Sequence, residues 1–297
     1  MKKIIILASL VAIMTACSNS NDKFDATGTF EATENIVSAE QNGKLISFLI
    51  NEGELIEAGF EAGLIDTMQL YLQIQQLQAQ KAVFQNQKPD SEKQLAATRE
   101  QLQKARLEQK RYQDLLRDGA TSEKTVDDIN NQVKVLERQL DAQQSALQKQ
   151  LATLSAQVSA TDAQIDVLQN QLGKCHIVAP VRGTVLEKYA EQNELAVVGK
   201  PLFKIADIEN MYLKAYITSS QLTDVKIGQK VRVFADFGGN DRKEYDGTIT
   251  WISQRSEFTP KTILTNDERA DLVYAIKIAV KNDGYIKIGM YGEMKLK

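Results

Sequence analysis

The chain has little of the chemistry from which catalytic and metal sites are built. It contains one histidine and two cysteines among 297 residues. His176 directly follows Cys175, and adjacent residues of a strand point to opposite faces, so the two are poorly placed to bind one metal ion and are interpreted as ordinary packing residues. No phosphate-binding loop, dinucleotide-binding motif or paired serine and histidine occurs. The sequence therefore predicts no catalytic residue, no metal, no cofactor and no enzyme activity.

The chain also lacks an excess of charge of one sign. Lysine and arginine total 36 against 39 aspartates and glutamates, which gives a formal net charge of −3. Without a basic cluster there is no electrostatic surface for nucleic acid, so that class of partner is excluded. With 43% hydrophobic residues the chain can bury a core, and its length allows roughly one to three domains.

Long hydrophobic runs are absent, and the one apolar run near the start is short. Lys2 and Lys3 precede apolar residues from Ile4 to Ile13. A membrane-spanning helix needs about 20 apolar residues, so this run has the layout of a cleaved export signal instead. The sequence predicts that the segment is removed during export.

Cys17 follows this run directly after small residues. The order Met14-Thr15-Ala16-Cys17 resembles the lipobox of bacterial lipoproteins, in which the cysteine is diacylated and becomes the first mature residue. It predicts a signal peptide at residues 1–16, lipidation of Cys17 and a lipidated linker at residues 17–27. Two acyl chains anchor a protein far better than one does. The alternative is an ordinary signal peptide that happens to contain a cysteine.

Two segments of the chain, residues 37–66 and 173–206, match each other at a constant offset. Each residue of the first corresponds to one 140 positions later, for example Gly43 to Gly183 and Gly59 to Gly199. Both segments alternate apolar residues with turn signals, which indicates short strands joined by tight turns. A few short strands do not cover their own apolar face, so we expect the two halves to pack together.

Between the halves, residues 67–172 contain a single proline, Pro89, and a single glycine, Gly119. Glutamine, alanine, leucine, lysine and glutamate are abundant there, and these residues favour helix. Apolar residues recur every three or four positions, as in a coiled-coil seam. The turn is expected near Gly119, which divides the segment into two equal antiparallel arms, each roughly 75 Å long at 1.5 Å rise per residue.

A joint is expected within this hairpin. Pro89 must interrupt the first arm, because proline removes a backbone donor and clashes with the preceding turn. On the other arm, the eleven residues from Leu140 to Leu151 depart from the regular spacing, and such a step locally unwinds a coiled coil. The sequence predicts that the two irregularities face each other, with the joint at Pro89 and Lys149.

After the second half, residues 207–297 form short alternating segments separated by glycines, which predicts a small antiparallel barrel. The expected strands are Met211 to Ile217, Lys230 to Ala235, Tyr245 to Ile252, Leu272 to Val280 and Met290 to Leu296. Residues 28–36, which precede the first half-repeat, are expected to add a further strand to this barrel.

The repeat and hairpin together resemble the periplasmic adaptor family, also called membrane fusion or HlyD-like proteins. The resemblance rests on Val37-Ser38-Ala39, Gly43, Glu52-Gly53-Glu54, Gly59 and Asp66, and on Ala179-Pro180-Val181-Arg182-Gly183 beyond the helical segment. It implies an α+β multi-domain fold, in which a biotinyl/lipoyl-like β domain is split by a long antiparallel α-helical coiled-coil hairpin and followed by a β-barrel.

The expected hairpin tip carries the most specific part of the resemblance. Arg111, Leu115 and Ser122, followed by Asp128, are similar to the family's Arg-x3-Leu-x6-Ser signature for docking onto a TolC-like outer-membrane channel. A structural role is open for each residue. Ser122 can cap the second helix, Leu115 can belong to the seam, and Arg111 can be a solvated helix residue.

The implied function is that of an adaptor linking an inner-membrane transporter to a TolC-like channel as a homo-oligomeric ring, anchored by lipid in the cell envelope, with the inner membrane favoured. The segment from Thr259 to Arg269, with Leu272 to Ala275 and Gly289-Met290, is similar to the branch that serves ABC-type exporters. Alternatives are a proton-driven RND-type pump, a passive coiled-coil lipoprotein, and a lipoate or biotin carrier. For the carrier, the turn that would present the modified lysine is replaced by the helical segment.

Overall fold

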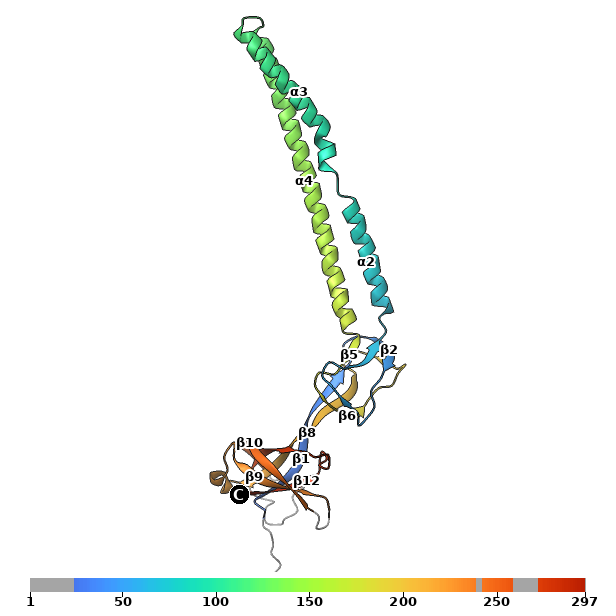
Figure 1. Cartoon of the computed structure of the whole chain (residues 1–297), viewed down its shortest axis with the longest axis vertical. Helices are drawn as coiled ribbons and strands as arrows, with labels where there is room; N and C mark the ends of the chain where they lie inside the picture. The colour runs from blue at the N-terminus through green and yellow to red at the C-terminus, as the bar shows by residue number, and fades with distance from the viewer. Residues whose placement is uncertain (1–23, 239–241, 259–271, 297) are drawn as a thin grey trace, which may run out of the picture.

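The computed structural model describes residues 24–238, 242–258 and 272–296. The expected signal peptide, the proposed lipidation site Cys17 and the segment from Thr259 to Arg269 lie outside the described residues. Figure 1 shows three parts in a row, with the helical hairpin extending from a small β unit and a second β unit at the opposite end. The expected mixed α and β architecture with a long helical hairpin is confirmed.

Three helices form the hairpin. They are α2 (Met68–Asn86), α3 (Ser91–Arg117) and α4 (Glu123–Gly173). The first arm is interrupted at Pro89, between α2 and α3. Asp90 caps the start of α3, because its side chain accepts a hydrogen bond from the Lys93 N–H at 3.2 Å. The predicted break at Pro89 is therefore confirmed, whereas α4 continues through Lys149 as an unbroken helix of 51 residues.

Polar contacts fix the register of the two antiparallel arms. They join Lys81 to Asp162 at 2.6 Å, Thr98 to Gln143 at 2.9 Å, Arg106 to Glu137 at 2.7 Å, and Gln109 to Asn130 at 2.8 Å. Extending this register places the break opposite a point slightly beyond Lys149 on α4. On the inner face of α4, Val126, Val133, Leu147 and Leu154 are buried at steps of seven residues or multiples of seven.

The β unit next to the hairpin is built from the two half-repeats. The first contributes β2 (Gly43–Phe48), β3 (Leu55–Ile56) and β4 (Glu61–Ile65), and the second contributes β5 (His176–Val178), β6 (Gly183–Lys188), β7 (Leu195–Ala196) and the start of β8 (Pro201–Thr218). Strands β2 and β6, and likewise β3 and β7, begin 140 residues apart, so the repeat seen in the sequence is also a structural repeat.

The two halves are interlocked by exchanged hydrogen bonds. Strand β3 pairs with β6 of the other half, and β2 pairs with β7. The Gly53 N–H donates to the Val185 carbonyl at 2.8 Å, and the equivalent Asn193 N–H donates to the Leu45 carbonyl at 2.8 Å. Each half therefore completes the backbone hydrogen bonding of the other, which explains why neither half would be stable alone.

Gly53 adopts the left-handed backbone conformation, and so does Asn193, the equivalent residue of the second half-repeat. Gly53 has φ 83°, and Asn193, at the equivalent position of the second half, has φ 75° and is the only non-glycine with positive φ among the described residues. Asparagine tolerates this conformation better than most residues with a side chain. The repeat therefore preserves backbone shape even where the residue type differs.

The second β unit is a curled antiparallel sheet. It contains β1 (Ala26–Ser38), β9 (Lys230–Asp236), β10 (Arg242–Phe258), β11 (Leu272–Lys281) and β12 (Tyr291–Leu296), together with the later part of β8. The strand order is β1-β12-β9-β10-β11-β8, and an additional pairing of β1 with β8 closes the sheet on itself. Phe30, Leu213, Val233, Ile249 and Ile276 are among the fully buried side chains inside it.

Strands β1 and β8 continue from one β unit into the other. Their pairing is interrupted by a bulge, since Glu31 pairs with Tyr212 and Thr33 with Asp207, so that four residues on β8 face the single Ala32 on β1. Within the described part of the chain, none of the helices has the length and apolar character needed to cross a membrane.

Candidate docking site

The tip of the hairpin is closed by a specific turn at the end of α3. Gly119 has φ 68°, a left-handed conformation that glycine adopts without steric cost. The Ala120 N–H donates to the Leu115 carbonyl at 2.8 Å, and the Gly119 N–H donates to the Leu116 carbonyl at 3.0 Å. This pair of bonds is a Schellman motif, which satisfies the last carbonyls of the helix and reverses the chain.

Ser122 begins the returning helix. Its Oγ accepts a hydrogen bond from the Thr125 N–H at 3.2 Å and lies 2.8 Å from Thr125 Oγ1, so Ser122 is the N-cap of α4. The structural role considered for this residue from the sequence is therefore present. Its exposed position leaves a further contact with a partner open.

Arg111 and Leu115 lie one turn apart near the end of α3, at the end of the hairpin where Ser122 caps the start of α4. Arg111 is exposed, and among the described residues no side chain forms a hydrogen bond or ion pair with it. Leu115 is half-buried. Its carbonyl holds the Schellman turn, but part of its side chain remains accessible. The structure thus brings the three residues expected at the tip to one end of the molecule.

The other arginine at the tip has a carboxylate partner. Arg117 forms an ion pair with Asp114, and Glu123 lies in the first turn of α4, where it complements the helix dipole. Arg111 therefore stands out as a tip arginine without a carboxylate partner in the described part of the chain. An unpaired guanidinium beside a partly exposed leucine offers both an ionic and an apolar contact to another protein.

At the other end of the hairpin, the adjacent residues Cys175 and His176 differ in their exposure to solvent. Cys175 is buried, and burial raises the pKa of its thiol, with a smaller effect of Asp66 in the same direction. His176 is exposed, and its Nδ1 lies 2.6 Å from Glu61 Oε1. The interpretation of His176 as a packing residue is therefore wrong. The described residues contain no cluster of three or more histidine, cysteine, aspartate or glutamate side chains suited to a metal.

Arg182 has a role that the sequence did not assign. It donates from Nε to Glu57 Oε1 at 3.1 Å, and from both terminal nitrogens to the two carboxylate oxygens of Glu209 at 3.1 Å each. These bonds, to Glu209 first and Glu57 second, raise the pKa of the guanidinium. Arg182 therefore connects both half-repeats to the segment that leads into the second β unit.

The backbone beside Glu209 is also held in place. The Asn282 N–H donates to the Glu209 carbonyl at 2.8 Å, and its side-chain amide donates to the Ile208 carbonyl at 2.9 Å. Asn282 follows β11 and is 9% exposed. Arg182 belongs to the stretch from Ala179 to Gly183 that carries part of the family resemblance, but its partners lie 27 and 125 residues away from Arg182 in the chain.

No family model matches the chain. Among curated proteins, the chain is similar to a UPF0194 membrane protein of Yersinia enterocolitica, with 27% identity over 97% of this chain and 96% of the relative. A UPF0194 membrane protein of Citrobacter koseri is 28% identical over 98% of this chain and 96% of its own length. In each comparison, the similarity therefore covers almost the whole of this chain and of its relative.

Solved structures share the fold. MacA from Actinobacillus actinomycetemcomitans superposes with a TM-score of 0.54 at 22% identity, covering 91% of this chain and 76% of MacA. The membrane fusion protein Spr0693 from Streptococcus pneumoniae R6 superposes with a TM-score of 0.51 at 17% identity, covering 91% of this chain and 98% of that protein. The resemblance to membrane fusion proteins expected from the sequence is confirmed at the level of the fold.

Proposed function

We propose that the chain is the adaptor subunit of an export pump of the bacterial envelope, joining an inner-membrane transporter to a TolC-like outer-membrane channel. The hairpin carries this proposal. Its arms project roughly 75 Å from the β units, and its closed tip exposes Arg111 beside Leu115. A helical pair this long buries little surface per residue, so its length is better explained by reach than by stability.

The partner at the inner membrane is proposed to be an ABC-type transporter. Support comes from the resemblance of the segment around Thr259 to Arg269 to the adaptor branch that serves such transporters. In this arrangement the transporter supplies the energy and the chain supplies the connection. A proton-driven transporter is the alternative, and copurification of the chain with its inner-membrane partner would distinguish the two.

The anchor is proposed to be lipid on Cys17, which places the chain in the envelope with the inner membrane favoured. The curated relatives are named membrane proteins, which agrees with a membrane-bound chain. Phe24, the first described residue, follows Cys17 by seven positions, which span at most about 25 Å when extended. An acylated Cys17 would therefore keep the β unit formed by β1 and β9–β12 close to the membrane, with the hairpin tip farthest from it.

Several copies are proposed to form a ring. One hairpin does not enclose a conduit, whereas hairpins and β units arranged side by side around an axis would do so. Closed rings are a common result of head-to-tail contacts between identical subunits.

The proposal is tested by changing the charge of the tip without changing its folding. Arg111→Asp removes no hydrogen bond or ion pair among the described residues, so the tip should fold unchanged. Because it reverses the charge at the proposed contact, we expect it to abolish export of a dye or antibiotic from cells that depend on this chain. Arg99→Asp is the matched control, because Arg99 is an exposed arginine lower on the same helix, and export should be unchanged.

A second tip variant separates docking from capping. Ser122→Asp keeps a residue that caps a helix well and adds a negative charge, so helix content measured by circular dichroism should stay constant while export falls. Normal export by both tip variants, at normal expression, would reject the docking role.

A further inference from the structure

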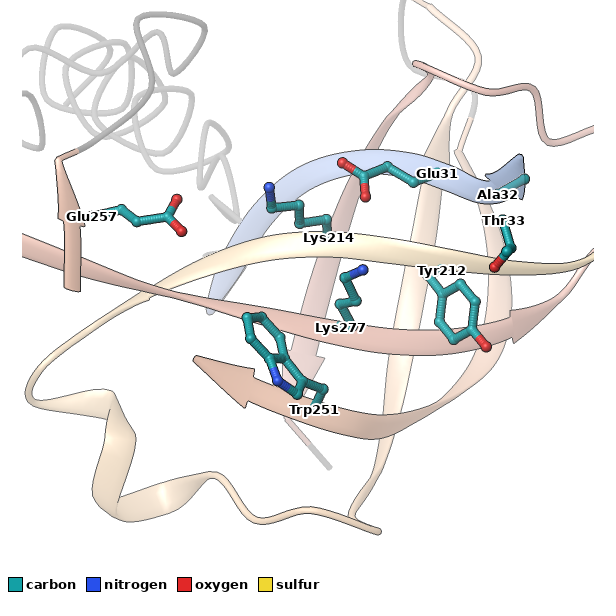
Figure 2. A pocket seen from close by; sticks show the side chains of 8 residues that line it. All are labelled: Glu31, Ala32, Thr33, Tyr212, Lys214, Trp251, Glu257 and Lys277. Atoms are coloured by element: carbon teal, nitrogen blue, oxygen red, sulfur yellow. The ribbon is translucent and has the colours of Figure 1, made fainter. Parts of the chain in front are cut away.

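An open groove lies on the outer surface of the β unit formed by β1 and β8–β12. It has a volume of about 670 Å³ and is lined by Glu31, Ala32, Thr33, Tyr212, Lys214, Trp251, Glu257 and Lys277. These residues come from four neighbouring strands, β1, β8, β11 and β10, and Figure 2 shows their side chains gathered over the sheet. The volume is within the range of small-molecule sites in proteins.

Two lysines face each other directly in this groove. Lys214 of β8 and Lys277 of β11 are partners in the strand ladder. Like charges at directly opposed positions of a sheet repel each other. Neither ammonium forms an ion pair with a carboxylate of the described residues, and that of Lys214 lies 5.9 Å from the Tyr216 ring. The fold therefore places two lysines side by side on one face of the sheet, and neither has an ion-pair partner among the described residues.

Two carboxylates, Glu31 and Glu257, line the same groove without forming an ion pair with either lysine. Partial burial acts to lower the pKa of Lys214, but Tyr216, Glu31 and Glu257 outweigh it and raise that pKa. Figure 2 shows Lys214 between Glu31 and Glu257, and Lys277 between the Trp251 and Tyr212 rings. The groove therefore carries two ammonium groups and two carboxylates, and the carboxylates would repel a second negative charge on a ligand.

An aromatic surface adjoins the lysines. Trp251 is the only tryptophan in the chain and is the ladder partner of Lys277, and it remains 42% exposed. Tyr212 lies on the other side of Lys277. Tryptophan and tyrosine rings offer large, rigid apolar surfaces for binding.

We propose that this groove binds an amphipathic monoanion. Its acid group lies between Lys277 and Lys214, and its apolar body lies on Trp251 and Tyr212. The single charge follows from the two flanking carboxylates, and the apolar body follows from the exposed rings. This site is independent of the docking tip and does not require the proposed function.

Binding can be measured by tryptophan fluorescence, because Trp251 is the only tryptophan in the chain. The full chain carrying Cys17→Ser, which has no acyl chain to compete, is titrated with decanoate below its micelle concentration while Trp251 fluorescence is recorded. We expect a saturable change that fits one site. Decanol and decyltrimethylammonium, which match its chain length without the negative charge, should bind at least about tenfold more weakly.

Substitutions then locate the site. Lys277→Gln should weaken decanoate binding about fivefold to tenfold, and Lys214→Gln should act in the same direction. Lys230→Gln, which removes an exposed lysine of β9 outside the groove, is the matched control and should leave the affinity unchanged. An unchanged melting temperature shows that each variant is folded.

Three outcomes would overturn the proposal. They are the absence of a saturable change with decanoate, equal binding of decanol and decanoate, and equal affinity of the Lys277→Gln and Lys230→Gln variants. The second outcome would identify unspecific apolar partition onto Trp251.

Discussion

The interlocked half-repeats and the helical hairpin bury apolar surface in different ways. Leu45, Val185, Phe203 and Ile205 in the β unit are 0% exposed, whereas the most buried apolar seam residues of the hairpin, Leu95 and Val133, retain 4%. The β unit has a closed core to which both halves contribute. The hairpin has only a narrow seam, so each turn is stabilised mainly by the turn facing it.

The difference in packing suggests different roles for the two parts: the β unit stabilises the fold, and the hairpin extends the molecule. Exchanged hydrogen bonds make the two half-repeats one cooperative unit, because neither half retains its partners if the other unfolds. In the hairpin, cross-arm contacts occur at intervals, and loss of one leaves the others in place. We therefore expect the β unit to determine the stability of the fold and the hairpin to tolerate change.

The largest expected effect is a cavity in the core of the interlocked halves. Phe203→Ala should lower the free energy of unfolding by about 3–5 kcal/mol, because a fully buried ring is lost and the surrounding core closes only partly. Leu102→Ala, in the hairpin seam, should cost about 2–3 kcal/mol. Urea denaturation, monitored by circular dichroism, measures the free energy of unfolding of both variants. A larger loss from Leu102→Ala would contradict the comparison.

A smaller effect is expected where the two halves share a backbone shape. Asn193→Val should destabilise the fold by about 1–2 kcal/mol, because a β-branched residue resists the left-handed conformation. Gly53→Val should destabilise the fold by a similar amount, since Gly53 has the same backbone conformation in the first half-repeat. Asn193→Gly, the control, should stay within a few tenths of a kcal/mol in the same denaturation assay. Different costs of the two valine variants would argue against equivalent halves.

The hairpin seam contains a polar pair that can be replaced as a unit. Thr98 is 6% exposed and donates from its hydroxyl to Gln143. Thr98→Val alone should cost about 1 kcal/mol, because Gln143 loses its partner, whereas Thr98→Val with Gln143→Leu should be nearly neutral. Thermal unfolding of the two variants checks this. Equal costs would show that the pair has no mutual dependence.

The smallest effect on stability is expected at Arg182, whose role is positional. Arg182→Gln should leave the melting temperature almost unchanged, because the side chain and its partners are exposed. It should broaden the distance distribution between spin labels on β7 and β9, since both ionic contacts to Glu57 and Glu209 are lost. Arg232→Gln, which breaks a pair with Glu244 inside one β unit, is the control and should not broaden it.

The sequence predicted those parts of the fold that depend on local chemistry. Gly119 and Ser122 marked the hairpin tip, Pro89 marked the break in the first arm, and the half-repeats were visible as matched turns. These signals are local because they reflect backbone conformations that few residues adopt. The three tip residues could be placed together for the same reason.

Side-chain contacts that depend on long-range strand register were not predicted. The contact of Arg182 with Glu57 joins residues 125 positions apart, and the opposition of Lys214 and Lys277 depends on how β8 pairs with β11. A shift of one residue in that pairing would move one lysine to the other face of the sheet. The error at His176 has a similar origin, because its partner Glu61 lies on another strand.

The central claim is that the hairpin tip contacts an outer-membrane channel, and photo-crosslinking in intact cells tests it most directly. A photoreactive residue is placed at Arg111, and separately at Leu107, which is 65% exposed one turn lower on α3. The account predicts a crosslink to an outer-membrane channel protein from position 111 that is much stronger than from position 107. Equal crosslinking from the two positions, or none from position 111 in exporting cells, would contradict it.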